Sequence, residues 1–182
     1  MKLVGYLLHT REGLDGEAGL FYDYIVAEEG LFIRAQNPLI RATICIGPVE
    51  IRGLAPLNER VELVHGKIPR FLYDLALSLL MASSEKEQYL AITWEDEYRL
   101  RIPSQERAET SVKYENLPAS VMDIHSHGGG SAWFSGTDNI DMQGLRLDMV
   151  VGKLNTLLPE VEIRLGVYGY FAPVNTGEIF DV

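Results

Sequence analysis

The residues from Asp123 to Asp138, DIHSHGGGSAWFSGTD, constrain the fold of this chain more than any other stretch. One residue separates His125 from His127, so a strand that ends here would carry both imidazoles on the same face. Three consecutive glycines then give the backbone the freedom for a tight reversal, after which Asp138 would return in the first turn of a helix. The sequence therefore predicts a strand, a reversal and a helix that bring two imidazoles and one carboxylate together.

This set of side chains indicates a metal site. Two neutral imidazoles and a carboxylate around one open position are typical of catalytic zinc, whereas structural zinc sites more often use cysteines. Ser135 and Asp138 also match a capping box, in which both side chains would only satisfy free backbone N–H groups at the start of a helix. The histidine pair, the glycines and the aspartate together favour the metal site over the cap alone.

The spacing H-S-H-x7-S-x-x-D resembles the signature of the JAMM (MPN-plus) metallopeptidases, a family that includes deubiquitinating enzymes and prokaryotic relatives. The resemblance implies Zn2+ as the cofactor, with His125, His127 and Asp138 as its ligands. It also implies that Ser135 helps to stabilise the oxyanion. Gly128 departs from the family, which commonly has proline after the second histidine, so this loop is expected to be more mobile or differently shaped.

The family also uses a glutamate before a strand that follows a helix, where it accepts a proton from water. A helix is predicted from 69 to 83, because Pro69 suits a first helical position and the following apolar residues form one stripe. A strand, QYLAITW, follows it at 88–94. Glu85 and Glu87 would point the same way in an extended segment. Glu87 is the preferred general base, because it stands directly before the strand.

The chain is expected to form two parts. Residues 1–68 contain short strand patterns with turn signals about every ten residues, which predicts a small antiparallel sheet. For residues 69–182 the resemblance implies a JAMM-type α/β sandwich of a mixed sheet and helices. Within it, the pattern predicts a second helix from Gly136 to Leu147 and then two closing strands, with Tyr168, Tyr170 and Phe171 in the core. The expected fold class is α/β, with the strand-rich segment first.

Two features leave alternatives open. Asp123 lies on the same strand face as His125, where it would either support a histidine or be exposed. Residues 104–118 form a charged connection that would either contact substrate or be a solvated loop.

Composition excludes several classes of protein. Lys and Arg total 16 against 26 Asp and Glu, a net charge of -10, so the chain should be repelled by nucleic acid. Cys45 is the only cysteine, so an internal disulfide or a cysteine-rich metal site cannot form. No apolar run approaches the ~18 residues of a membrane span, and no cleavable signal is recognisable. A cytoplasmic protein without membrane or nucleic-acid partners is therefore expected.

The resemblance implies a zinc metallopeptidase, of isopeptidase or deubiquitinase type. Its substrate would be a peptide or isopeptide bond, often at the C-terminal tail of a ubiquitin-like protein, and a ThiF-like activating protein is a candidate partner. The alternative is a non-catalytic JAMM-like binding or scaffold module. Nucleobase deamination is set aside, because its H-x-E and P-C-x-x-C patterns are absent.

Overall fold

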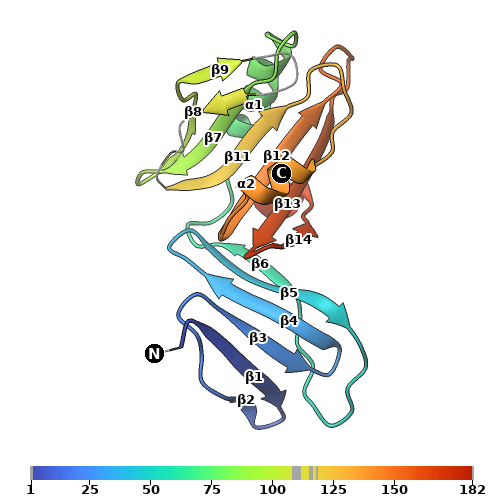
Figure 1. Ribbon diagram of the computed structural model, residues 1–182. Coiled ribbons are helices and arrows are strands. Elements are labelled where there is room, and N and C mark those ends of the chain that lie inside the picture. The colour runs from blue at the N-terminus through green and yellow to red at the C-terminus, as the bar shows by residue number, and fades with distance from the viewer. Residues whose placement is uncertain (1, 108–111, 115–116, 118, 182) are drawn as a thin grey trace. The chain divides into compact units, whose positions relative to one another are not determined.

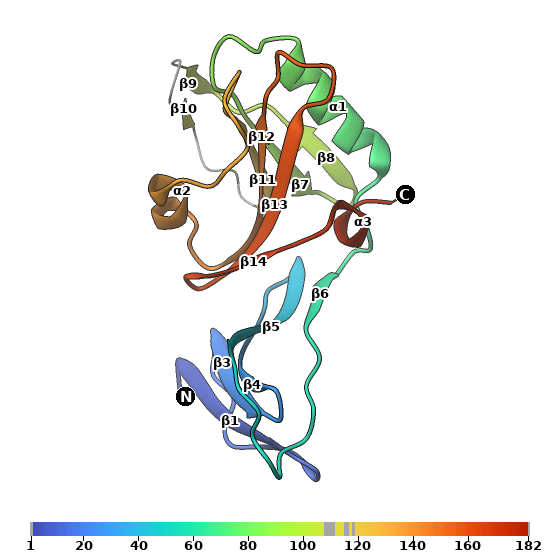
Figure 2. The same cartoon turned by 90° about the vertical axis from the view of Figure 1, so that its right-hand side faces the viewer.

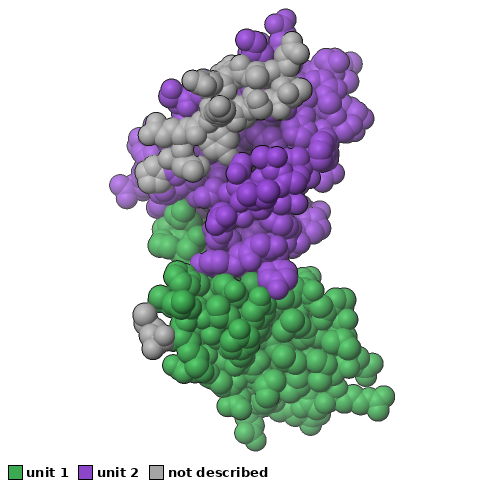
Figure 3. All heavy atoms as spheres, viewed as in Figure 1, with its two compact units in different colours: residues 1–66 green, residues 67–182 purple. Residues whose placement is uncertain are grey.

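The computed structural model describes residues 2–107, 112–114, 117 and 119–181. The chain forms two compact units, residues 1–66 and 67–182, so the division falls two residues before the expected one (Figure 3). Over the described residues, each unit contains one mixed sheet of six strands, and three short helices lie in the second unit. The protein is thus mixed α/β, which agrees with the expected class. None of the described helices combines the length and the apolar character that a membrane crossing needs.

The first unit is a sheet with the strand order β2-β1-β3-β4-β5-β6 (Figure 1). Its strands are β1 (Val4–Thr10), β2 (Gly13–Asp15), β3 (Tyr22–Ala27), β4 (Gly30–Gln36), β5 (Ile40–Pro48) and β6 (Arg60–Leu63). One face buries a small apolar core of Leu7, Ile25, Ala27 and Phe32, against which Cys45 and Leu57 pack.

The expectation of a purely antiparallel sheet is wrong, because β1 and β3 run parallel. The connection between β2 and β3 returns along β1, where the backbone N–H groups of Leu20 and Phe21 donate to carbonyls beside the start of that strand. Glycines allow this close approach: a Cβ on Gly19 would lie 2.3 Å from the backbone nitrogen of Gly5.

The second unit has the strand order β14-β13-β12-β11-β7-β8, and only β11 and β12 pair in parallel. Its strands are β7 (Tyr89–Trp94), β8 (Tyr98–Arg101), β11 (Ser120–Ser126), β12 (Leu145–Gly152), β13 (Glu160–Val167) and β14 (Tyr170–Pro173), with a separate pair β9 (Gln105–Arg107) and β10 (Val112–Tyr114). Its helices are α1 (Arg70–Met81), α2 (Gly136–Asp141) and α3 (Thr176–Ile179).

The two faces of this second sheet differ in chemistry. Helix α1 covers one face, and α2 lies on the other (Figure 2). Alternate residues of the central strands make the α1 face apolar, and these are buried: Leu90, Ile92, Met122, Ile124, Leu147 and Met149. The intervening residues of β11 are Asp123 and His125, which therefore face the α2 side. An apolar face fixes the register of the strand, and the register fixes where His125 points.

Several predicted boundaries in this unit are wrong. Helix α2 ends at Asp141 rather than Leu147, since Gly144 has a φ of +79° and β12 begins directly after it. The last predicted strand is instead a hairpin, β13 and β14, with a turn at Tyr168 and Gly169, both of which have positive φ. Tyr170 and Phe171 are 36% and 37% exposed, so they are not core residues.

The charged connection at 104–118 contains strands β9 and β10, which pair antiparallel. Residues 108–111, 115, 116 and 118 of that connection lie outside the described residues.

Candidate metal centre

Three side chains predicted as metal ligands come together at the end of β11. His125 is the penultimate residue of that strand, and His127 is the first residue after the strand. Asp138 lies in the first turn of α2. One ligand atom from each of these residues lies within 4.8 Å of the other two. The ring centroids of the two histidines are 5.1 Å apart. The strand, reversal and helix predicted from the sequence thus bring the two imidazoles and the carboxylate into one cluster.

His125 has an unsatisfied nitrogen in this cluster. Its Nε2 is buried without a hydrogen-bond partner and lies 3.6 Å from the Oδ1 atom of Asp138. Burial, opposed by the Asp138 carboxylate, lowers the pKa of His125 to about 4. The imidazole is therefore neutral at physiological pH and keeps a lone pair for a metal ion.

His127 is oriented by the loop that follows it. Its Nδ1–H donates to the carbonyl oxygen of Ser131 at 3.2 Å, which leaves Nε2 as the nitrogen available to a metal. Metal-binding histidines commonly donate their other ring N–H to a carbonyl or carboxylate in this way, which fixes the tautomer and the ring direction.

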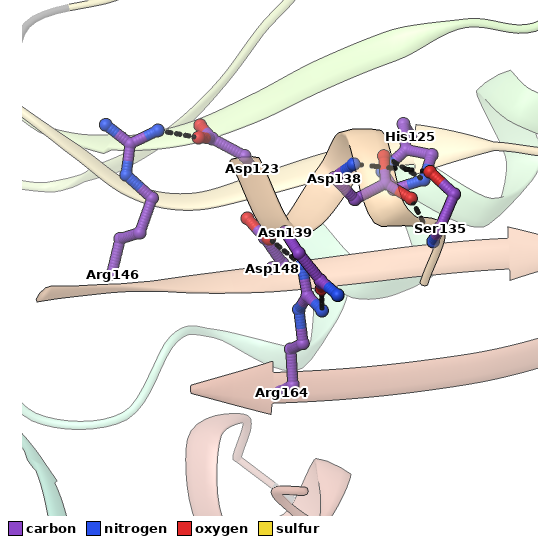
Figure 4. A network of polar contacts seen from close by, with 8 residues as sticks. All are labelled: Asp123, His125, Ser135, Asp138, Asn139, Arg146, Asp148 and Arg164. Atoms are coloured by element: carbon purple, nitrogen blue, oxygen red, sulfur yellow. Dashed lines mark hydrogen bonds and ion pairs between the residues drawn. The ribbon is translucent and has the colours of Figure 1, made fainter. Parts of the chain in front are cut away.

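Asp138 serves as a helix cap and as a candidate ligand at once. Its Oδ2 accepts the backbone N–H of Ser135 at 2.5 Å, and the Ser135 hydroxyl accepts the N–H of Asp138 at 3.2 Å (Figure 4). The other carboxylate oxygen, Oδ1, faces His125. The two interpretations of the S-x-x-D pattern are therefore compatible, because the capping box directs the free oxygen into the cluster.

The backbone conformation of Gly128 is one that excludes the proline commonly found at this position of the JAMM signature. Gly128 has a φ of +53°, a conformation that proline cannot adopt. A Cβ at this position would lie 3.0 Å from the carbonyl oxygen of Ser84. The loop after His127 thus runs close to the segment that follows α1, which is the segment that carries Glu87.

Glu87 is half-buried, whereas Glu85 is exposed. Burial is the largest influence on the pKa of Glu87 and raises it. The charge of His127 lowers this pKa, and the Asp138 carboxylate raises it. Glu87 therefore lies within electrostatic range of two candidate ligands. Its segment is fixed by the neighbouring buried Gln88, whose side-chain amide donates to the carbonyl of Ser83 at 2.7 Å.

The cluster fits a zinc ion. With metal–ligand distances of about 2.0–2.1 Å, the donors of a tetrahedral site lie about 3.3 Å apart, which is close to the 3.6 Å between His125 and Asp138. Two imidazole nitrogens and one carboxylate oxygen are a donor set that zinc commonly takes at catalytic sites. The buried nitrogen of His125 has no hydrogen-bond partner in the part of the chain that the structure describes, and it gains a partner if such an ion binds.

Asp123 is buried rather than exposed. It accepts hydrogen bonds from the Tyr89 hydroxyl at 2.7 Å, the Ser120 hydroxyl at 2.6 Å and Arg146 at 2.6 Å. It also faces Asp148 on the neighbouring strand. Burial, followed by the charge of Asp123, raises the pKa of Asp148 to about 7.

Sequence reasoning did not identify Arg164, which contacts Asp148 and Asn139 beside this cluster. A signal was present: Arg146 and Asp148 in β12 and Glu162 and Arg164 in β13 are spaced by two within otherwise apolar runs. Such spacing places charges on one face of adjacent strands.

The chain was compared with models of known protein families and with curated proteins, and neither comparison found a match. The functional proposal therefore rests on the geometry of these residues and on the motif they form.

Proposed function

We propose that this chain is a zinc-dependent metallopeptidase of the JAMM type, which cleaves a peptide or isopeptide bond. One observation carries the proposal: ligand atoms of His125, His127 and Asp138 lie within 4.8 Å of one another, and the buried Nε2 of His125 has no hydrogen-bond partner among the described residues. A cap or a solvated loop does not require a neutral, desolvated histidine that faces a carboxylate.

The three ligands would hold zinc, which supplies a Lewis acid that polarises the substrate carbonyl and lowers the pKa of water to about 7. Glu87 accepts the proton of the attacking water and later returns it to the leaving amine. Its raised pKa suits both steps, because a carboxyl group that titrates closer to neutral pH can both take up and release a proton.

Ser135 is the candidate donor to the developing oxyanion. Its oxygen accepts the backbone N–H of Asp138, so its own O–H proton is not used in that bond. A donor of this kind is worth about 3 kcal/mol of transition-state stabilisation in comparable sites.

The substrate class follows from the resemblance to JAMM proteins. It is an extended peptide tail, typically the C-terminus of a ubiquitin-like protein, and a ThiF-like activating protein is the corresponding candidate partner. Among prokaryotic members, a strand-rich segment followed by the metallopeptidase core resembles the A protein of the PRTRC system. The net charge of -10 favours a partner with a basic surface.

A non-catalytic JAMM-like binding module is the second candidate function. It would keep the fold and the capping box but would not need Glu87 as a proton acceptor. Zinc content and turnover therefore have to be measured together.

The test uses the full chain, Glu87→Gln and the matched control Glu85→Gln, which removes a carboxylate two residues away. Zinc is measured by elemental analysis, and turnover is measured on ubiquitin-like proteins with a C-terminal extension and on a short tail peptide. Glu87→Gln should keep zinc and lose at least ~100-fold in rate, while Glu85→Gln should match the wild type. Wild-type protein that binds zinc but cleaves none of these substrates would favour the binding module.

A further inference from the structure

Arg164 is a buried cation on the α2 face of the second sheet. Its side chain is 8% exposed, and it lies in β13 directly opposite Asp148 in β12. Asp148 in turn lies opposite Asp123 in β11. Arg164 therefore belongs to a row of charged residues, Asp123, Asp148 and Arg164, that crosses three strands. His125 lies in the next row on the same face, two residues after Asp123 along β11.

The guanidinium of Arg164, in the sheet, donates hydrogen bonds both to α2 and to the neighbouring strand β12. One of its terminal N–H groups donates to the Oδ1 atom of Asn139 at 2.5 Å, and the other donates to Asp148 at 3.3 Å (Figure 4). Asn139 is the residue after Asp138 in α2. The contact therefore holds the helical turn that presents the carboxylate to His125.

Arg164 also contacts the loop before α2. Its guanidinium carbon lies 3.9 Å from the ring centre of Phe134 and 4.3 Å from that of Phe171. The Phe134 ring is 6.2 Å from the ring of His125. Arg164 thus touches a neighbour of each of two candidate ligands, Asn139 beside Asp138 and Phe134 beside His125.

Helix α2 needs such a contact because it is short. It has six residues and buries none of them, and a helix of this length is not stable without tertiary contacts. Its C-cap residue, Met142, is buried and packs at Gly166 in β13. The Arg164–Asn139 bond restrains the residue that directly follows Asp138 in the helix.

We propose that Arg164 is a positioning residue of the metal centre: through Asn139 and Phe134 it sets the position of Asp138 relative to His125, and with it the affinity and geometry of zinc binding. This inference rests on the proposed zinc site and deepens it. Residues that orient metal ligands typically change metal affinity or activity by 10–100-fold when they are substituted.

If Arg164 only stabilised the fold, a variant that keeps wild-type stability would also keep wild-type zinc affinity. The buried Nε of Arg164 has no hydrogen-bond partner among the residues that the structure describes, so the side chain is not fully satisfied where it lies. When both members of a buried ion pair are replaced by groups of similar volume, a protein often keeps or gains stability. Arg164→Met combined with Asp148→Asn should therefore fold with near wild-type stability and still bind zinc more weakly.

The main experiment measures zinc affinity by chelator competition and ligand geometry by the visible spectrum of the cobalt-substituted protein. The variants are Arg164→Lys, Arg164→Met with Asp148→Asn, and Asn139→Ala. Of these, Asn139→Ala is expected to disturb folding least, because the side chain of Asn139 is exposed. The matched control is Arg146→Lys, which alters an arginine–aspartate pair on the same face that does not involve α2. The three test variants should bind zinc 10–100-fold more weakly with an altered cobalt spectrum, and the control should stay within about threefold of wild type with an unchanged spectrum.

A second readout needs no metal. In metal-free protein, the amide of Asp138 donates to Ser135 and that of Met142 donates to the Asp138 carbonyl. Both should exchange with solvent at least about tenfold faster in Asn139→Ala than in Arg146→Lys. Faster exchange in a chain that binds no zinc would leave the positioning role intact and refute the proposed metal site. Unchanged exchange, affinity and cobalt spectrum in the folded variants would overturn the inference.

Discussion

The Arg34–Asp23 pair of the first unit and the Arg164–Asp148 pair of the second unit are satisfied in different ways. In the first unit, Asp23 is fully engaged: Oδ1 accepts the N–H of Gly19 at 2.7 Å, and Oδ2 accepts two N–H groups of Arg34 at 3.1 and 2.7 Å. Through its bond to Gly19, Asp23 holds the β2–β3 connection against the sheet. In the described part of the second unit, Arg164 and His125 each keep a buried nitrogen that has no hydrogen-bond partner.

The difference is between a hydrogen-bonded network that is satisfied within the chain and one that leaves buried nitrogen atoms unsatisfied among the described residues. Buried polar groups in native proteins are normally satisfied, so the exceptions need an explanation. In the second unit we propose a metal ion as the explanation, because the unpartnered nitrogen of His125 faces a carboxylate and lies beside a second imidazole. In the first unit His9 also has an unpartnered ring nitrogen, but the metal-ligating clusters found among the described residues do not include it.

The largest effect on stability is expected from Asp23→Ala. Removing this buried carboxylate leaves Arg34 and the N–H of Gly19 without a partner, which should cost about 2–3 kcal/mol, less than a fully buried pair because Arg34 is 36% exposed. Hydrogen exchange of strand amides during urea titration measures the loss in each unit. Zinc content should not change.

The matched control for Asp23→Ala is Glu62→Ala, which removes partners of Arg41 and Arg60, both mostly exposed. It should cost less than about 1 kcal/mol. Equal losses in the two variants would contradict the structural role assigned to Asp23.

A pH effect of about 2 kcal/mol is expected from Asp148. Its folded-state pKa, about 7, lies above the unfolded value of 3.8, so the folded state binds more protons between these values. Its contribution to stability is full below 3.8 and is lost as pH rises through 7. Metal-free wild type should therefore lose stability relative to Asp148→Asn as pH rises from 5 to 8, as followed by urea unfolding.

In the same titration, the contribution of His125 to stability changes with pH in the opposite direction. Its pKa is lowered to about 4, so its contribution is present above 6.5 and is lost as pH falls. The comparison with Asp148→Asn isolates Asp148, because His125 is unchanged in both proteins. A constant difference between the two proteins across this pH range would refute the buried, easily protonated state of Asp148.

The smallest effect is expected from glycine substitutions. Gly128→Ala should cost about 1 kcal/mol from its positive φ, with an added cost because the new Cβ meets the Ser84 carbonyl at 3.0 Å. Gly144→Ala is the control, since it also has positive φ but has open space around its Cβ position. Zinc affinity should fall only for Gly128→Ala. A similar fall for both variants would show that the loop after His127 does not depend on this glycine.

Local sequence patterns predicted the clustering of His125, His127 and Asp138 better than they predicted the fold around it. The histidine spacing and the capping box act over 14 residues, from His125 to Asp138, so periodicity and turn chemistry are enough to predict them. The Arg164–Asn139 bond joins residues 25 apart. It depends on which strands become neighbours, and no local pattern encodes that.

The same limit explains the error in topology, and it explains why periodicity alone could not choose between Glu85 and Glu87. The parallel pairing of β1 with β3 depends on a connection that folds back along the first strand, which turn signals alone do not reveal. Glu85 and Glu87 share a strand parity, so periodicity could not separate them. The structure distinguishes them by burial, because Glu87 is half-buried and Glu85 is exposed.

The most direct test of the metal centre is the zinc content of the purified full chain and of His125→Ala combined with His127→Ala. Both proteins are dialysed against the same zinc buffer, and elemental analysis is normalised to protein concentration. The wild type should carry about one zinc per chain and the double variant none, with both remaining folded. A double variant that retains as much zinc as the wild type would contradict the central claim that these histidines form the site.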